Sequence, residues 1–295
     1  MSREASFQRA VEACLERECE LPQGAALVVA VSGGPDSMAL LSALARARER
    51  RSDQLLAVSC DHGLRPEARE EIHLVEQAAR NWGVEFLALE LGLSPGANLQ
   101  ERAREARYRA LWTAADQRFG ESAFLVTAHH ADDRAETVLL RLLRGTSLAG
   151  LGVLRAREGR LLRPAIRCTR AQVLTHLERH AIASVHDPSN EDPRYQRVRV
   201  RQELMPLLHE LAPGIVAQLC QLADEAAQGE PALGLNREQR NQLQRALRGA
   251  PGPVDVWLPR GLRLIRGAAG GAASSAGSSA GGVAADPGEP GTRDD

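Results

Sequence analysis

The stretch VVAVSGGPDSMALL runs from Val28 to Leu41 and connects an apolar run to a helical pattern through two glycines and a proline. The apolar run ALVVAV, which ends at Val31, predicts a buried strand, and a helix is expected to begin near Asp36. Consecutive glycines let a backbone approach an anion closely, and the first N–H groups of a helix have no partner within it. The stretch therefore predicts either a phosphate-binding loop at Ser32–Ser37 or a tight strand-to-helix turn without a ligand.

Two common nucleotide-binding loops are excluded by the residues themselves. A Walker A loop ends in Gly-Lys-Ser or Gly-Lys-Thr, whereas all 37 basic residues of this chain are arginine. A dinucleotide-binding fingerprint needs a third glycine, which SGGPDS lacks. The loop therefore belongs to neither of these classes.

The composition is typical of a soluble globular protein. Of 295 residues, 43% are hydrophobic and 25% are charged, and the net charge of −1 gives no overall attraction to nucleic acid. The five cysteines form no C-x-x-C pair and no zinc-binding spacing, which favours a reducing compartment. Since the chain lacks an apolar run of about 18 residues and its N-terminus has the pattern of an amphipathic helix, we expect a cytoplasmic protein without a membrane partner.

Short apolar runs alternate with longer helical patterns between residues 25 and 165. Strands are expected at 25–31, 55–60, 84–89 and 123–128, and helices at about 36–50, 67–82, 98–118 and 132–143. Strands connected by helical crossovers predict an α/β fold, with a parallel sheet that carries helices on both faces.

Three regions are expected along the chain. Residues 1–210 are expected to form the α/β domain with its core at about 25–165, and residues 211–266 a small, mainly helical region. The segment VDVWLPRGLRLIRG, residues 254–267, can contain a short strand. Residues 267–295 are rich in Gly, Ala and Ser and are predicted to be disordered, because such a composition cannot bury a core.

Polar side chains follow three of the predicted strands, at residues 32–37, 61–65 and 127–133. In open parallel sheets the ligand lies outside the carboxyl ends of the strands. We therefore expect these three segments to form one composite site.

Six segments together resemble a known family. The loop SGGPDS resembles the signature of the ATP pyrophosphatase, or PP-loop, superfamily. With it come, in order, DHGLRPEA (61–68), NLQERAREARYRAL (98–111), VTAHHADDRAETVLLRLLRGTSLAGLGVL (126–154), RPAI (163–166) and HDPSNEDPRYQRVRVRQELMPLL (186–208). Their order and spacing resemble the tRNA(Ile)-lysidine synthetase family over roughly residues 25–210.

The resemblance implies an ATP-dependent ligase that forms a carbon–nitrogen bond during tRNA processing. In that family ATP adenylates the C2 oxygen of the wobble cytidine in a CAU-anticodon tRNA(Ile), and pyrophosphate leaves. The ε-amine of L-lysine then attacks C2 and expels AMP, which gives lysidine and changes decoding from AUG to AUA. The implied substrates are tRNA(Ile), L-lysine and ATP, and Mg²⁺ is expected with ATP.

The resemblance also implies roles for individual residues. ATP binding is assigned to Ser32, Gly33, Gly34, Pro35, Asp36, Ser37, Asp61 and His62, with Asp36 near Mg²⁺. Lysine binding is assigned to Asp132, Asp133 and Glu136, and catalysis to Asp36, Asp133, Glu136, Arg104 and Arg107. A cationic substrate needs acids to hold it, although acids are also common in the solvated first turn of a helix. His129 and His130 can pack, cap a helix, move a proton or contact a phosphate.

Arginine-rich segments provide a local basic surface that the net charge hides. We expect tRNA contacts from Arg144, Arg163, Arg197 and Arg201, with solvated helix faces as the alternative.

Two features depart from the family pattern. Val198 stands where the family usually has asparagine, and few residues beyond about 210 remain for choosing the correct tRNA. That choice is therefore expected to depend mainly on the catalytic domain and on helices at 210–250. The alternatives are a PP-loop enzyme that thiolates tRNA, an amidating ligase, and a nucleotide- or RNA-binding module without activity.

Overall fold

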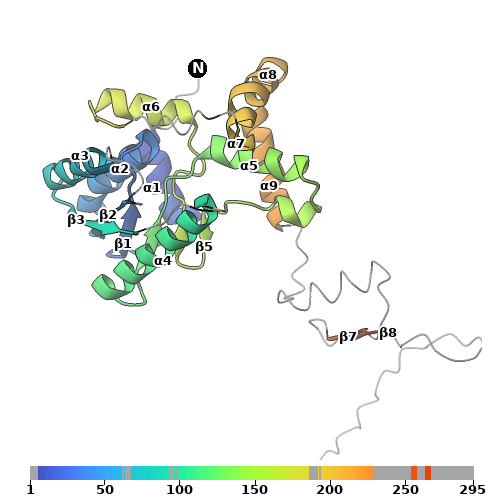
Figure 1. Cartoon of the computed structure of the whole chain (residues 1–295), viewed down its shortest axis with the longest axis horizontal. Helices are drawn as coiled ribbons and strands as arrows, with labels where there is room; N and C mark the ends of the chain where they lie inside the picture. Colours follow the sequence, from blue (N-terminus) through green and yellow to red (C-terminus); the bar gives the residue numbers. More distant parts are fainter. Residues whose placement is uncertain are drawn as a thin grey trace, which may run out of the picture. The chain divides into compact units, whose positions relative to one another are not determined.

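The computed structural model describes residues 6–61, 63, 68–92, 96, 99–185, 192 and 194–228, and the backbone of 254–257 and 263–266 (Figure 1). The chain divides into two compact units, Met1–Glu230 and Pro231–Asp295. Among the helices described, none is long and apolar enough to cross a membrane.

The first unit is built on a six-stranded sheet with the order β3-β2-β1-β4-β6-β5. Its strands are β1 Ala26–Ala30, β2 Gln54–Asp61, β3 Glu85–Glu90, β4 Phe124–Val126, β5 Arg157–Glu158 and β6 Leu161–Leu162. All neighbours pair in parallel except β5 and β6, which pair antiparallel. The predicted α/β fold with a parallel sheet is confirmed, and the β5–β6 hairpin is an addition that the sequence did not indicate, since each strand has only two residues.

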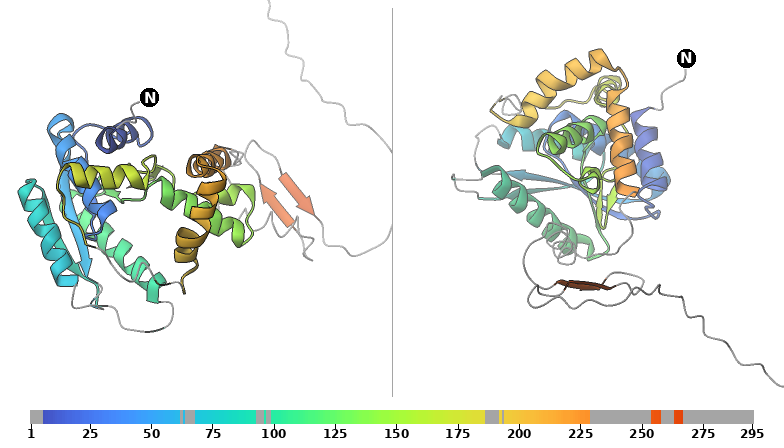
Figure 2. Two further views of the ribbon diagram at one scale, coloured as in Figure 1. Left: turned by 90° about the horizontal axis from the view of Figure 1, so that it is seen from above. Right: turned by 90° about the vertical axis from the view of Figure 1, so that its right-hand side faces the viewer.

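Helices cover both faces of this sheet, as Figure 2 shows. They are α1 Phe7–Arg17, α2 Pro35–Arg51, α3 Ala68–Asn81 and α6 Arg170–Arg179 on one side and α4 Leu99–Phe119 on the other, whereas α5 Ala131–Leu143 packs in a separate cluster. Along β1, Leu27 and Val29 pack in the core with α1, α2, α3 and α6, whereas Val28 packs in a second core with Leu111 and Ala115 of α4. The alternation arises because successive side chains of a strand point to opposite faces.

The helices that follow residue 185 form a third apolar cluster with α5. They are α7 Gln196–Arg199, the π-helical segment η3 Val200–Leu204, α8 Met205–Leu211 and α9 Ile215–Gln228. Earlier in the chain, the 3-10 helix η1 Leu148–Leu151 lies between α5 and β5. Helix α9 packs its Leu219, Ala223 and Ala226 in one core with Ala135 and Val138 of α5. The contact boundary therefore falls at Glu230, beyond the predicted domain end at residue 210.

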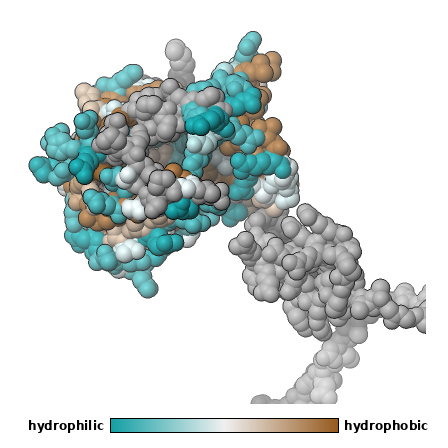
Figure 3. Space-filling model, in the orientation of Figure 1, coloured by the Kyte–Doolittle hydropathy of each residue, from teal (hydrophilic) through white to brown (hydrophobic). Residues whose placement is uncertain are grey.

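Helix α8 exposes apolar side chains on the outside of this region. Leu207 and Leu211 are exposed, and the brown surface at the upper right of Figure 3 lies over α8.

The second unit contains a described hairpin, β7 Val254–Trp257 paired antiparallel with β8 Arg263–Arg266. One short strand was expected here, and the structure has two. The predicted disordered tail at 267–295 and the helices expected between 229 and 250 lie outside the described residues.

Candidate active site

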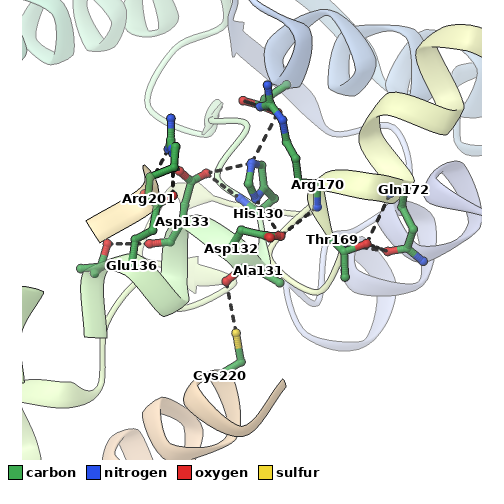
Figure 4. Close-up of polar contacts among 12 residues, drawn as sticks. His130, Ala131, Asp132, Asp133, Glu136, Thr169, Arg170, Gln172, Arg201 and Cys220 are labelled. Carbon is green, nitrogen blue, oxygen red and sulfur yellow. Dashed lines mark hydrogen bonds and ion pairs between the residues drawn. The ribbon is translucent and has the colours of Figure 1, made fainter. Parts of the chain in front are cut away.

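The candidate site lies at the carboxyl ends of β1 and β4, which are neighbours in the sheet. The loop after β1 carries Ser32–Ser37, and the loop after β4 leads through His129 and His130 into α5. The start of α6 at Arg170 completes the site (Figure 4). Two of the three expected segments are therefore brought together.

The phosphate loop is closed by hydrogen bonds among its own atoms. Ser37 Oγ donates to the carbonyl of Gly34 at 2.9 Å, and the Ser32 N–H donates to Ser37 Oγ at 3.2 Å. Gly33 has φ of +82°, and its carbonyl accepts the Val185 N–H at 2.9 Å. Helix α2 begins after Gly34 without a capping side chain among those described, so its first N–H groups face the loop and suit an anion.

Asp36, in the first turn of α2, connects the loop to α6 and α5. Its carboxylate accepts Arg170 Nη1 at 2.5 and 2.6 Å, and His130 Nε2 lies 3.4 Å from its Oδ1. Burial alone would raise the pKa of Asp36, but the hydrogen bond and charge of His130, together with Arg170, lower it. Asp36 is therefore an anion in the folded protein.

His130 is buried among three carboxylates and only 2% exposed. Its ring nitrogens lie 3.4 Å from Asp36 and 3.5 Å from both Asp132 and Asp133. Burial works against the charged imidazole, but the close carboxylates of Asp132, Asp36 and Asp133 raise its pKa to about 10. His130 is therefore protonated at neutral pH and holds the three acids together.

His129, unlike His130, is neutral at neutral pH. Burial lowers its pKa to about 4, and the nearby positive charges of Arg163, Arg197 and Arg104 add to this effect, which Asp133 opposes. Its Nδ1 hydrogen-bonds the Thr127 hydroxyl at 3.0 Å. The adjacent histidines therefore divide into one neutral and one cationic ring.

Asp133 and Glu136, one helical turn apart on α5, form a site that binds cations. Glu136 is 3% exposed and accepts Arg201 Nε at 2.7 Å and Arg197 Nε at 3.0 Å. Asp133 accepts Arg197 Nη2 at 3.1 Å through Oδ1 and the backbone N–H of His130 at 3.1 Å through Oδ2. These two carboxylates thus bind two guanidinium groups, and His130 connects Asp133 to Asp36 of the phosphate loop.

Asp132 points to a different neighbour from the other two acids. Its Oδ2 accepts the backbone N–H of Arg170 at 2.8 Å, which fixes the start of α6. Burial would raise the pKa of Asp132, but His130 and the Arg170 N–H lower it. Asp132 therefore contacts His130 and the start of α6, whereas Arg197 and Arg201 contact the other two acids.

The other residues predicted to bind ATP or to take part in catalysis lie farther from the loop or outside the described residues. Asp61 ends β2 and accepts the Gly63 N–H at 2.7 Å, and His62 lies outside the described residues. On α4, Arg104 is exposed and stacks on Tyr108 at 4.9 Å, while Arg107 is half-buried.

The four arginines predicted to contact tRNA have three different environments. Arg197 and Arg201 bind the acid pair, and Arg144 is exposed at the end of α5. Arg163 is 3% exposed and donates to the carbonyl of Arg155 and to Glu158 at 3.0 and 3.1 Å, while its Nε has no partner among the described residues. Its contact with tRNA stays a prediction.

Arg170 is a site residue that was not predicted from the sequence. The capping box of Thr169 and Gln172, in which the Gln172 N–H donates to Thr169 Oγ1 at 3.3 Å, marks the helix start. That pattern indicates a helix beginning at Arg170, but no local pattern indicates a partner as distant in sequence as Asp36.

The described residues offer a partial fit to Mg²⁺. Among them, no group of three or more His, Cys, Asp or Glu side chains could hold a metal ion. However, Mg²⁺ that arrives with a nucleotide usually binds one or two carboxylates together with phosphate oxygens. Asp36 supplies such a carboxylate beside the loop.

Comparison with known proteins agrees with this arrangement. The family model of the PP-loop domain matches residues 3–208. The tRNA(Ile)-lysidine synthase of Bradyrhizobium sp. strain BTAi1 is 48% identical over 189 residues, which are 62% of this chain and 52% of the relative. That of Thermobifida fusca strain YX is 37% identical over 227 residues, or 76% of this chain and 69% of the relative.

A solved structure shares the fold. The U34-tRNA thiolase NcsA from Methanococcus maripaludis superposes with a TM-score of 0.64 at 18% identity, over 76% of this chain and 78% of that one. The class that fold and loop define is therefore that of the PP-loop proteins. Within that class, the chain belongs to the tRNA(Ile)-lysidine synthase family. It spans between 52% and 65% of the length of the first three relatives.

The left-handed backbone at Gly33 gives a test of the loop. Gly33→Ala should lower the free energy of unfolding by about 1–2 kcal/mol, because only glycine adopts this φ without strain. Gly34→Ala is the matched control, since Gly34 has an extended backbone with φ of −69°. Urea unfolding of the two variants provides the measurement. Equal losses of stability would contradict the assigned geometry.

The two histidines should titrate far apart when Mg²⁺ and ATP are absent. The folded pKa of His130 is about 10, above the unfolded value of about 6.5, so its stabilisation is present below about pH 6.5 and is lost as pH rises through about 10. The folded pKa of His129 is about 4, so stability is instead lost as pH falls from about 6.5 towards 4. NMR titration of labelled imidazoles, assigned with His129→Gln and His130→Gln, measures both. A His130 ring that titrates near the unfolded value would refute this charge assignment.

Proposed function

We propose that this chain is a tRNA(Ile)-lysidine synthase that uses ATP, L-lysine and a CAU-anticodon tRNA(Ile). In the first step the C2 oxygen of the wobble cytidine attacks the α-phosphorus, the bond between the α- and β-phosphates breaks, and pyrophosphate leaves. In the second step the lysine ε-nitrogen bonds to C2 and AMP leaves with the oxygen. The names of the relatives, at 48% and 37% identity, support this reaction.

The pairing of Asp133 and Glu136 with guanidinium groups carries the proposal most directly. These carboxylates already bind two cations, at 2.7 to 3.1 Å, beside the phosphate loop. A lysine ammonium has the same charge and needs the same acceptors. We infer that it takes the place of at least one guanidinium group at these acids, and that this acidic cluster receives the proton which the ammonium loses before attack.

The phosphate loop supports the first step. The N-terminus of α2 presents backbone N–H groups to an anion, and Ser32 and Ser37 add hydroxyl donors next to it. Pyrophosphate is an anionic leaving group, so donors fixed at this position stabilise its developing charge. Arg170 orients Asp36, the carboxylate that would hold Mg²⁺ beside the phosphates and screen their charge.

Arg197 and Arg201 would then serve two partners in turn. Their side chains are 43% and 45% exposed, so each can turn outward when lysine binds their acids. A guanidinium group released in this way is suited to a tRNA phosphate, as is the exposed Arg144. This exchange keeps the charge of the site balanced during the reaction.

Incorporation of labelled lysine tests the proposal. The full chain is incubated with radiolabelled lysine, ATP and an unmodified CAU-anticodon tRNA(Ile) transcript, and the nucleosides of the product are analysed. We expect label in the tRNA only with ATP, with release of AMP and pyrophosphate. ATP binding without lysine incorporation would reject the proposal, and a thiolated nucleoside would support the tRNA-thiolating alternative.

Two variants should separate the steps. Asp36→Asn should prevent transfer of α-³²P from ATP to the tRNA, because the loop loses its carboxylate. Glu136→Gln should keep this transfer in the absence of lysine but lower lysine incorporation by about 10- to 100-fold, since a buried carboxylate of the cation site becomes neutral.

The matched control for Glu136→Gln is Glu203→Gln, because Glu203 forms an exposed ion pair with Arg199 at 2.7 Å away from the acid cluster. We expect wild-type lysine incorporation for this control. Equal losses in the two glutamine variants would contradict the role of Glu136.

A further inference from the structure

The side of α5 that faces away from Asp133 and Glu136 carries a buried arginine. Arg134 is 2% exposed, and its Nε donates to the carbonyl of Val153 at 2.9 Å. Its Nη1 lies 2.8 Å from Asp224 Oδ1 on helix α9. A buried guanidinium group needs an anionic partner, so Asp224 supplies the charge that allows Arg134 to remain inside.

Asp224 joins more than one element behind the site. Besides Arg134, it accepts both Nη atoms of Arg167 at 2.5 and 3.1 Å, and Arg167 also binds Glu18, the residue that follows α1, at 2.7 Å. Three residues after Arg167, Arg170 binds Asp36 of the phosphate loop. The same short segment therefore contacts both α9 and the loop.

Helix α9 also reaches the very start of α5. Cys220 lies one turn before Asp224, and its Sγ donates to the carbonyl of Ala131 at 3.4 Å, as Figure 4 shows. A cavity of about 540 Å³ is lined by Asp132 of α5 and by Cys220 and Asp224 of α9, among other residues. The first turn of α5 thus lies between the acid site and α9.

We propose that Asp224 is a positioning residue for lysine binding, which acts by holding Arg134 and through it the first two turns of α5. This inference rests on the proposed function. With Arg134 fixed on one side of α5, Asp133 and Glu136 are held on the other side in the orientation that binds a cation. Asp224 lies beyond residues 3–208, so the part of the chain matched by the PP-loop domain does not contain this support.

The physical reason is the cost of an unpaired buried charge. When the Asp224 carboxylate is lost, Arg134 keeps Arg167 as a neighbouring cation but loses its anion. The guanidinium group must then move towards water or towards another acid, and α5 moves with it. Small displacements of binding groups lower rates strongly, even when the change lies behind the site.

Asp224→Asn tests this role in the full chain. We expect the KM for lysine to rise by about 10-fold or more. The transfer of α-³²P from ATP to tRNA in the absence of lysine should be unchanged, because Arg167 keeps Glu18 as an anionic partner and the segment that leads to Arg170 stays in place. Asp224→Glu, which keeps the charge, should restore much of the lysine affinity. A residue that only stabilises the fold would not separate the lysine step from adenylation.

A matched control is available near the amino end of β2, whereas the candidate site lies at the carboxyl ends of the strands. Arg51 and Asp53 form a buried pair at 2.8 Å, with both side chains 4% exposed, just before β2. Asp53→Asn should lower the midpoint of thermal unfolding, as Asp224→Asn does, but leave the KM for lysine at the wild-type value.

Failure of this inference and failure of the proposed function give different results. A wild-type KM for lysine in folded Asp224→Asn would overturn the inference, whereas absence of lysine incorporation by the wild-type chain would instead overturn the proposed function. If Asp224→Asn does not fold, the double variant Arg134→Gln/Asp224→Asn decides, because it removes both buried charges. A stable double variant with a raised KM for lysine supports the inference, and one with a wild-type KM overturns it.

Discussion

The site depends on the contacts that the buried imidazolium of His130 makes with the carboxylates of Asp36, Asp132 and Asp133. Asp36 comes from the phosphate loop after β1, and the other two acids come from α5 after β4. Like charges repel at such distances unless a cation lies between them. His130 therefore ties the anion-binding end of the site to its cation-binding end, and its pKa of about 10 keeps it charged at neutral pH.

Charge balance would also allow the proposed substrates of opposite charge to bind side by side at the carboxyl ends of the strands. The helix N-terminus of α2 favours anions, while Asp133 and Glu136 favour cations. In the protein without substrates, Arg197 and Arg201 neutralise those acids. In the proposed function, lysine binding is then an exchange of ionic partners and leaves no uncompensated charge, which would be costly inside a protein.

Much of this arrangement could be predicted from the sequence, because strand alternation and the loop pattern are local. The α/β fold and the meeting of Ser32–Ser37 with the acids of α5 followed from strands that end at one edge. The environments of individual arginines could not be predicted. Arg163 is buried and donates to Glu158 of the two-residue strand β5, and Arg170 pairs with an acid 134 positions away. Local sequence indicates neither environment, since both depend on tertiary packing.

The most direct test of the account is a crystal structure of the chain with L-lysine and a non-hydrolysable ATP analogue. We expect lysine Nζ within hydrogen-bond distance of Asp133 and Glu136, and the analogue's phosphates at Ser32–Ser37. At least one of Arg197 and Arg201 should be turned away from the acids. Lysine bound elsewhere, with both arginines still paired as they are now, would contradict it.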